Sequence, residues 1–362
     1  MWFVSDNTSP AAPEVLAAVL RSNQGHAASY GAEAAMGRVT ERLREVFEAP
    51  EAAVYLVPTG TAANALALAC LCPPWATVYC HRTAHVAEDE CGAPEFYTGG
   101  AKLTLIDGPD GRIAPEILEA MLASPARPGV HSVQRGALSL TNSTEAGTVY
   151  GPEEVARLAA MARRHGLPVH MDGARFANAL VALGCTPAEL TWRAGVDVLC
   201  FGGTKNGCMG VEAVILFEPA RAWELELRRK RGGHLFSKHR YLSAQMEGYL
   251  ADDLWRALAT HANARARQLA AGIAALPGAR LVHPAEANAV FAAWPRAGHR
   301  AMRAAGARYY LWPGDQSLDG PDDEPLSARL VCNWSTTEAD VEAFLQTLGA
   351  GMRAGEAAAI GR

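Results

Sequence analysis

The segments LPVHMDGARFANA (residues 167–179) and DVLCFGGTKNG (residues 197–207) decide the fold of this chain. Residues 167–171 and 196–201 are short, apolar, rich in Val and Leu, and preceded by helical patterns, which predicts two buried strands. Asp172 and Lys205 follow these apolar runs, so we expect both at the carboxyl ends of strands. In open α/β sheets that edge is where ligands bind.

An acid and a lysine at such an edge suit one cofactor well, pyridoxal phosphate (PLP). Lys205 would hold the aldehyde of PLP as a Schiff base, and Asp172 would keep the pyridine nitrogen protonated. Arginine cannot replace lysine in this role, because it does not lose its proton. The alternative is a surface lysine in a loop. The chain has four lysines, and Lys205 alone among them stands in a Gly-rich turn after an apolar strand: Lys102, Lys205, Lys230 and Lys238.

Composition predicts a soluble globular protein, with 49% apolar and 20% charged residues in a chain of 362. A net charge of −5 argues against a nucleic-acid partner. The exception is the basic cluster at residues 228–234, which is either a solvated helix end or a phosphate or subunit contact. The eight cysteines lack metal-ligand spacing, which predicts reduced thiols and no metal site. Because the first residues do not resemble a signal peptide, we expect a cytoplasmic protein.

The order of predicted elements indicates an α/β fold with a second, smaller domain. Apolar runs at 54–57, 76–80, 102–107, 137–141 and 211–217 predict further strands, with helices at 13–21, 33–47 and 115–122. We expect a mostly parallel mixed sheet flanked by helices in a large PLP-binding domain over 1–240, its N-terminal segment contributing to the site. A linking helix over 241–275 and a small C-terminal α+β domain over 276–362 follow.

Other polar residues are weaker candidates for the site. The PTGT turn before the helix near 62–70 offers backbone amides to an anion, although an ordinary helix cap has the same sequence. His85 and His131 stand in loops, where a histidine is either structural or available for chemistry. Tyr30 is a loop tyrosine that suits packing as well as chemistry. Arg329, inside an apolar strand, either meets an internal acid or binds a ligand carboxylate.

The order of several motifs resembles the L-threonine aldolase and β-eliminating lyase family, PLP enzymes of the aspartate-aminotransferase fold. The motifs are SDNTS (5–9), SYG (29–31), VPTGTAAN (57–64), HMDGARFANA (170–179) and FGGTKNG (201–207). The resemblance implies Lys205 as the Schiff-base lysine, Asp172 as the pyridine partner and His85 as the ring that stacks on PLP. The other roles that it implies are Arg175 on the cofactor ring oxygen or the substrate, Gly60 and Thr61 on the phosphate, Ser5 and Arg329 on the substrate carboxylate, and Tyr30 and His131 near the reacting hydroxyl.

The resemblance implies retro-aldol cleavage of β-hydroxy-α-amino acids (L-threonine, L-allo-threonine and phenylserine) to glycine and an aldehyde, with His85 or His131 near the base. Another PLP reaction, such as β-elimination or racemisation, and a PLP-binding protein without turnover are the alternatives. Typical members carry ENTH where this chain has TNST (141–144), and Lys238 and Arg240 compete for the phosphate. The resemblance also implies a homodimer or homotetramer.

Overall fold

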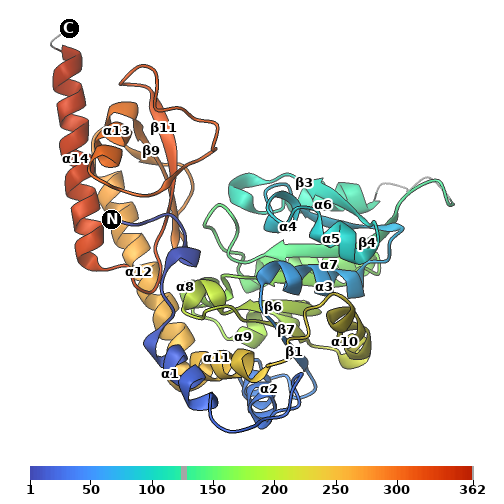
Figure 1. Ribbon diagram of the computed structural model, residues 1–362. Coiled ribbons are helices and arrows are strands. Elements are labelled where there is room, and N and C mark those ends of the chain that lie inside the picture. The colour runs from blue at the N-terminus through green and yellow to red at the C-terminus, as the bar shows by residue number, and fades with distance from the viewer. Residues whose placement is uncertain (124–128, 361–362) are drawn as a thin grey trace. The chain divides into compact units, whose positions relative to one another are not determined.

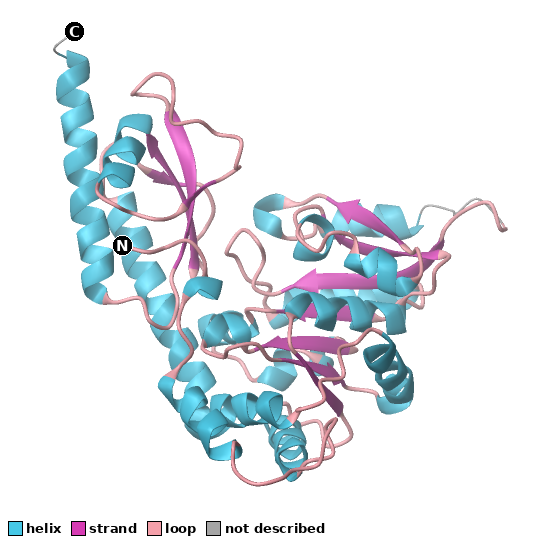
Figure 2. Ribbon diagram, in the orientation of Figure 1, coloured by secondary structure: helices cyan, strands magenta, loops and turns pink. Residues whose placement is uncertain are grey.

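The computed structural model describes residues 1–123 and 129–360 and divides into two compact units (Figures 1 and 2). The larger unit consists of Ala11–Glu145 and Val149–Arg256. The smaller unit consists of Met1–Pro10, Ala146–Thr148 and Ala257–Arg362. This division differs from the predicted boundaries at two places. The first ten residues belong to the smaller unit, and the predicted linking segment 241–275 is divided between the two units after Arg256.

The larger unit is built on a seven-stranded sheet whose order is β1-β7-β6-β5-β4-β2-β3. The strands are β1 (Ala53–Val57), β2 (Ala76–His81), β3 (Lys102–Ile106), β4 (Gln134–Thr141), β5 (Val169–Gly173), β6 (Val198–Gly202) and β7 (Glu212–Leu216). Strands β2 to β6 are parallel, whereas β7 runs antiparallel to both β6 and β1. The sheet is therefore mixed and mostly parallel, as the sequence predicts.

Helices cover both faces of this sheet (Figure 1). They are α1 (Pro13–Ser22), α2 (Ala34–Val46), α3 (Gly60–Leu71), α4 (His85–Glu88), α5 (Ala93–Thr98), α6 (Pro115–Ala123), α7 (Pro152–Arg164), α8 (Phe176–Leu183), α9 (Pro187–Leu190), α10 (Ala222–Arg231) and α11 (Arg240–Leu250). Helix α3 is apolar on all sides, and every residue from Ala62 to Leu71 is buried. Helix α7 is amphipathic instead, with Val155, Leu158, Ala159 and Ala162 buried at helical spacing.

The predicted linking helix over 241–275 is two helices in the structure. Helix α11 ends at Leu250, a 3-10 turn spans Ala251–Asp253, and α12 runs from Leu254 to Ala274. Asp252 and Asp253 have φ angles of 51° and 54°, a left-handed conformation that an α-helix does not continue through. Asp tolerates this conformation better than most residues, which explains why the chain breaks here.

The smaller unit contains a four-stranded antiparallel sheet of order β10-β11-β9-β8, packed with helices. Its elements are β8 (Arg280–Leu281), β9 (Ala289–Pro295), α13 (Arg296–Ala304), β10 (Tyr310–Leu311), β11 (Pro325–Val331) and α14 (Glu338–Ile360), with most of α12. Phe3 packs in this core, 5.1 Å from Phe344 between ring centroids, which ties the N-terminal segment to the unit. A small α+β unit is thus confirmed.

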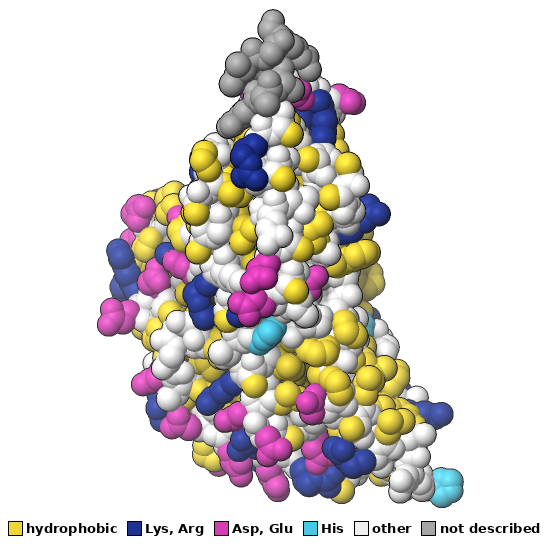
Figure 3. Space-filling view, turned by 90° about the vertical axis from the view of Figure 1, so that its left-hand side faces the viewer, with side chains coloured by type: hydrophobic (Ala, Val, Ile, Leu, Met, Phe, Trp, Pro, Cys, Tyr) yellow, Lys and Arg dark blue, Asp and Glu magenta, His cyan; other side chains and the backbone are white. Residues whose placement is uncertain are grey.

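Short 3-10 helices and the surface complete the description. The 3-10 helices not yet named are Asp6–Thr8, Pro109–Gly111, Trp192–Ala194, Thr204–Asn206 and Pro219–Arg221. Among the described residues, no helix combines the length and the apolar character needed to cross a membrane. On the face drawn in Figure 3, basic and acidic side chains are interspersed with apolar ones.

Candidate active site

The carboxyl ends of β4, β5 and β6 meet at one edge of the large sheet. Thr141 pairs with Asp172 in register, and Asp172 pairs with Cys200. Asp172 is the penultimate residue of β5 rather than the residue after it, because this strand begins and ends two residues later than predicted. Its side chain is buried, and Oδ1 accepts a hydrogen bond of 3.0 Å from the backbone N–H of Ala174. This bond fixes the carboxylate at the ligand-binding edge of the sheet.

Lys205 lies at the same edge, in the 3-10 turn Thr204–Asn206 that follows β6. Asn206 fixes this turn through two hydrogen bonds: its Nδ2 donates to the Tyr249 hydroxyl at 2.7 Å and to the carbonyl of Trp255 at 2.8 Å. The Tyr249 hydroxyl in turn donates to the carbonyl of Gly202 at 3.2 Å. The backbone that carries Lys205 is therefore fixed by buried hydrogen bonds, while the lysine itself is only half-buried.

The approach of β6 to β5 requires glycine at Gly202. A Cβ atom there would lie 2.3 Å from the carbonyl oxygen of Ala174, which is a backbone atom and cannot move aside easily. This contact explains why the chain has glycine at the last position of β6, two residues before Thr204.

His85 and Glu90 form a hydrogen-bonded pair beside Asp172. Nδ1 of His85 lies 2.9 Å from Oε1 of Glu90, which also accepts a bond of 2.8 Å from Nδ2 of Asn64 on α3. The ligand atoms of His85, Glu90 and Asp172 all lie within 4.8 Å of one another. This grouping could hold a metal ion, which the sequence did not predict, because Asp172 joins the other two only through the fold. We propose no metal, since His85 and Asp172 are the residues expected to contact PLP.

The electrostatics of this pair favour a shared proton. The hydrogen bond to Glu90 raises the pKa of His85, against the opposing effect of burial, and the negative charge of Asp172 adds to the rise. Burial raises the pKa of Glu90, and the charge of Asp172 acts in the same direction. Among the described residues, Oε2 of Glu90 is buried without a hydrogen-bond partner. His85 is therefore a stronger base than an isolated histidine.

The predicted phosphate turn begins helix α3, as the sequence predicts. Thr59 is the N-cap, and its hydroxyl accepts the N–H of Ala62 at 3.2 Å. The first amides of a helix have no partner within the helix, so those of Gly60 and Thr61 are oriented to receive an anion. A Cβ atom at Gly60 would meet nothing within 4 Å, so the space beside this helix start is open.

A family model described as β-eliminating lyase matches residues 3–295. The chain belongs to the β-eliminating lyase family. It is 43% identical over 334 residues to a protein of Pseudomonas aeruginosa named low specificity L-threonine aldolase, which covers 92% of this chain and 93% of the relative. A protein of the same name from a Pseudomonas species is 41% identical over 97% of this chain and 98% of its own length. A solved structure of the threonine aldolase of Leishmania major superposes with a TM-score of 0.87 at 28% identity, over 96% of this chain and 98% of that one.

Family membership confirms three expectations: a lyase, the fold class and PLP as the cofactor. Four of the predicted site residues in the larger unit lie at the carboxyl edge of the sheet or directly after β5, whereas Tyr30 lies in an exposed loop. His85, Asp172 and Lys205 lie together at the carboxyl edge, and Arg175 is buried at the start of α8, directly after β5. Tyr30 is exposed in a loop with a φ of 59°, and its ring lies 4.8 Å from Nζ of Lys230.

His131 is not brought to this edge. It precedes Gln134, the first residue of β4, whereas the site lies beyond the other end of this eight-residue strand. We therefore no longer assign it a place near the reacting hydroxyl. Its role near the hydroxyl came from the resemblance alone and not from its position before the strand.

Ser5 and Arg329 belong to the smaller unit. Ser5 caps the 3-10 helix Asp6–Thr8, and its hydroxyl accepts the N–H of Asn7 at 3.2 Å. Arg329 lies in β11, and its guanidinium is 5.7 Å from the ring centroid of Trp312.

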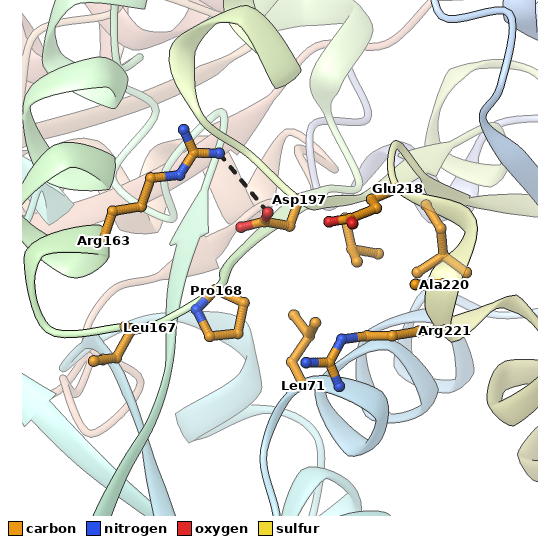
Figure 4. A pocket seen from close by; sticks show the side chains of 11 residues that line it. Leu71, Arg163, Leu167, Pro168, Asp197, Glu218, Ala220 and Arg221 are labelled. Carbon is orange, nitrogen blue, oxygen red and sulfur yellow. Dashed lines mark ion pairs between the residues drawn. The ribbon is translucent and has the colours of Figure 1, made fainter.

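A pocket of about 460 Å³ lies at the amino edge of the large sheet, away from these residues (Figure 4). Leu167 and Pro168 precede β5, and Asp197 precedes β6, with Arg163 3.8 Å from Asp197 across an ion pair. Oδ2 of Asp197 accepts the N–H of Val169 at 2.7 Å. None of the residues that line this pocket is among the predicted site residues.

Sequence reasoning missed Asn64, Glu90 and Glu212. Asn64 is a polar residue inside an apolar helix, and Glu212 is an acid inside an apolar strand, so each carried a detectable signal. Glu90 stands in the acidic segment EDE at 88–90, which has the pattern of an exposed turn and gave no such signal.

Proposed function

We propose that this lyase is an aldolase that cleaves β-hydroxy-α-amino acids such as L-threonine, L-allo-threonine and phenylserine to glycine and an aldehyde. The observation that carries the proposal is the grouping of a basic His85, a buried Asp172 and the lysine turn at one sheet edge. The names of the two Pseudomonas relatives support the substrate class.

The residues present fit PLP. Lys205 is an amine on a turn fixed by buried hydrogen bonds, and Asp172 is a buried carboxylate at the same sheet edge. Helix α3 begins beside open space at Gly60. PLP, when bound, supplies a sink for the electron pair of the broken Cα–Cβ bond. Each polar feature of the cofactor has a matching protein group: the aldehyde has the Lys205 amine, the ring nitrogen has the Asp172 carboxylate, and the phosphate has the first backbone amides of α3.

The protein groups then have separate tasks. Lys205 would hold the cofactor through its aldehyde. Asp172 holds a proton on the ring nitrogen, because a carboxylate fixed by the Ala174 N–H cannot turn away. His85 directs its Nδ1 proton to Glu90, which leaves Nε2 free to accept the β-hydroxyl proton. Arg175 contacts the ring oxygen or the substrate.

The remaining roles follow from the resemblance. Ser5 and Arg329 hold the substrate carboxylate, a group that an arginine recognises with two parallel hydrogen bonds. Tyr30 lies near the reacting hydroxyl. Gly60 and Thr61 receive the phosphate, together with Lys238 or Arg240.

A homodimer or homotetramer in the cytoplasm is part of the same proposal. A pocket of about 890 Å³ supports the assembly, because two exposed apolar side chains line it beside the charged Glu224, Arg228 and Arg231. These side chains are Phe96 and Leu227, which are 78% and 53% exposed in the single chain. Sedimentation of an active monomer would contradict this part.

Product analysis tests the activity. Incubation with L-threonine should release acetaldehyde and glycine, and phenylserine should release benzaldehyde and glycine. The family name makes β-elimination the competing reaction, and that reaction gives ammonia and a 2-oxo acid instead. Ammonia without any aldehyde from either substrate would refute the aldolase proposal.

A further inference from the structure

An acid in strand β7 is aimed at the turn that carries Lys205. Glu212 stands opposite Gly202 in the β6–β7 register and is 5% exposed. Its Oε2 accepts the backbone N–H of Gly203 at 3.0 Å. The other four residues of β7 are apolar, so a charge in this strand carries a desolvation cost that a hydrophobic residue would avoid.

Thr204 provides the second bond to this carboxyl group. Its hydroxyl accepts the N–H of Val211 at 3.2 Å and is also hydrogen-bonded to Glu212. Because a hydroxyl has one proton and this one already accepts from Val211, its proton is directed to the Glu212 carboxylate. The carboxylate thus accepts from both residues that directly precede Lys205.

The charged form of Glu212 has a favourable interaction with Lys205 and an unfavourable one with Asp172. The other titratable groups around it are Cys200, Cys208 and Tyr249; burial raises the pKa of each, and the negative charge of Glu212 raises it further. Burial raises the pKa of Glu212 itself to about 7. On protonation, Glu212 keeps only part of its acceptor capacity and loses its attraction for Lys205.

We propose that Glu212 is a positioning residue for Lys205: its carboxylate fixes the Gly203–Thr204 turn and stabilises positive charge on the lysine nitrogen. The proposal rests on the proposed function only in taking Lys205 as the residue that binds PLP. It predicts that the lysine nitrogen, with cofactor bound, holds its proton to a higher pH than it would without this acid.

The test is a spectrophotometric pH titration of the protein with PLP bound. The absorbance band of the lysine-bound cofactor reports the proton on the lysine nitrogen, and no substrate is needed. Glu212→Gln should lower the midpoint of this titration by about one pH unit. Glu212→Asp keeps the charge, so its midpoint should lie nearer to that of the wild type than to that of the Gln variant.

Asp197→Asn is the matched control. Burial raises the pKa of Asp197 as well, and this acid accepts a backbone N–H, but it precedes β6 at the opposite edge of the sheet. Its midpoint should equal that of the wild type. Thr204→Val removes one bond to Glu212 and nearly keeps the side-chain shape, so it should shift the midpoint in the same direction, which provides a second test if Glu212→Gln does not fold.

An unchanged midpoint in Glu212→Gln or, where that variant is unfolded, in Thr204→Val overturns the proposal. An equal shift in Asp197→Asn also overturns it, because the effect would then come from loosening of the sheet. The titration is independent of turnover. A protein that shows the band but releases no aldehyde from threonine would refute the aldolase activity, while the comparison of midpoints would still decide the role of Glu212.

Discussion

Replacing Glu90 by Gln should weaken the base that we assign to His85. The bond from Nδ1 of His85 to Oε1 of Glu90 is 2.9 Å long, and Glu90 is buried. A hydrogen bond to a charged group contributes about 1.5–3 kcal/mol. At about 1.4 kcal/mol for each pKa unit, loss of the negative charge should lower the pKa of His85 by about 1 to 2 units. The charge of Asp172 remains and keeps part of the elevation.

The assay is the pH dependence of kcat/KM for aldehyde release from L-threonine. In Glu90→Gln the acid limb should move to lower pH by about 1 to 2 units, and the plateau should fall about tenfold, because a weaker base accepts the hydroxyl proton less readily. Glu88→Gln is the control, since this acid is exposed in the same segment. The cofactor absorbance shows whether PLP is retained. An acid limb in Glu90→Gln that coincides with that of the wild type would refute the assignment of His85 as the base.

Three further predictions concern the lysine turn. Lys205→Arg should lose the yellow colour and nearly all turnover, because arginine does not lose its proton. Borohydride should fix PLP to the Lys205 peptide of the wild type only. An active, yellow Arg variant would contradict this prediction. Gly202→Ala should destabilise the fold by about 1–3 kcal/mol, because the added Cβ would meet a backbone oxygen. The control Gly37→Ala in α2 should stabilise the fold slightly, because its added Cβ meets nothing. Denaturant unfolding measures both variants, and equal stabilities would count against the packing argument. Since the pKa of Glu212 is about 7 in the folded protein against an ordinary 4.5, the folded state binds more protons between these values, and the unfolding free energy should fall by about 3 kcal/mol as pH rises through that window. Glu212→Gln should lose this dependence, and unfolding of both proteins at pH 5 and pH 8 tests it.

The fold was predictable wherever a local pattern matches its surroundings. The strands β2, β5, β6 and β7 are short and buried along their whole length, and the mostly apolar sequence that this burial requires is itself the signal. The break between α11 and α12 was not predictable in the same way. Asp252 and Asp253 fit a solvated helix face equally well, and only their left-handed backbone separates the two helices.

The site was predictable where a residue ends a strand and not where a partner comes from elsewhere in the chain. The positions of Asp172 and Lys205 at this sheet edge were predictable, because β5 carries Asp172 there and the turn after β6 carries Lys205. Glu90 contacts His85 only because the turn after α4 folds back, and Asn64 reaches it from α3. His131 is a different case, because it precedes the apolar run at 137–141, and a loop before a parallel strand lies at the amino edge; only the resemblance gave it a role in the site.

Two charged residues in apolar strands, Arg329 and Glu212, show how such site residues can be found from the sequence. A charge in an apolar strand needs a partner, and this criterion applies to Glu212 in the segment VEAVIL as well as to Arg329. Strand β7 pairs with β6 in antiparallel register, so the first residue of β7 must lie beside the last residue of β6, next to the lysine turn. A buried charge at the start of a strand that follows a predicted catalytic turn is therefore a candidate for the site even when its own segment contains no motif.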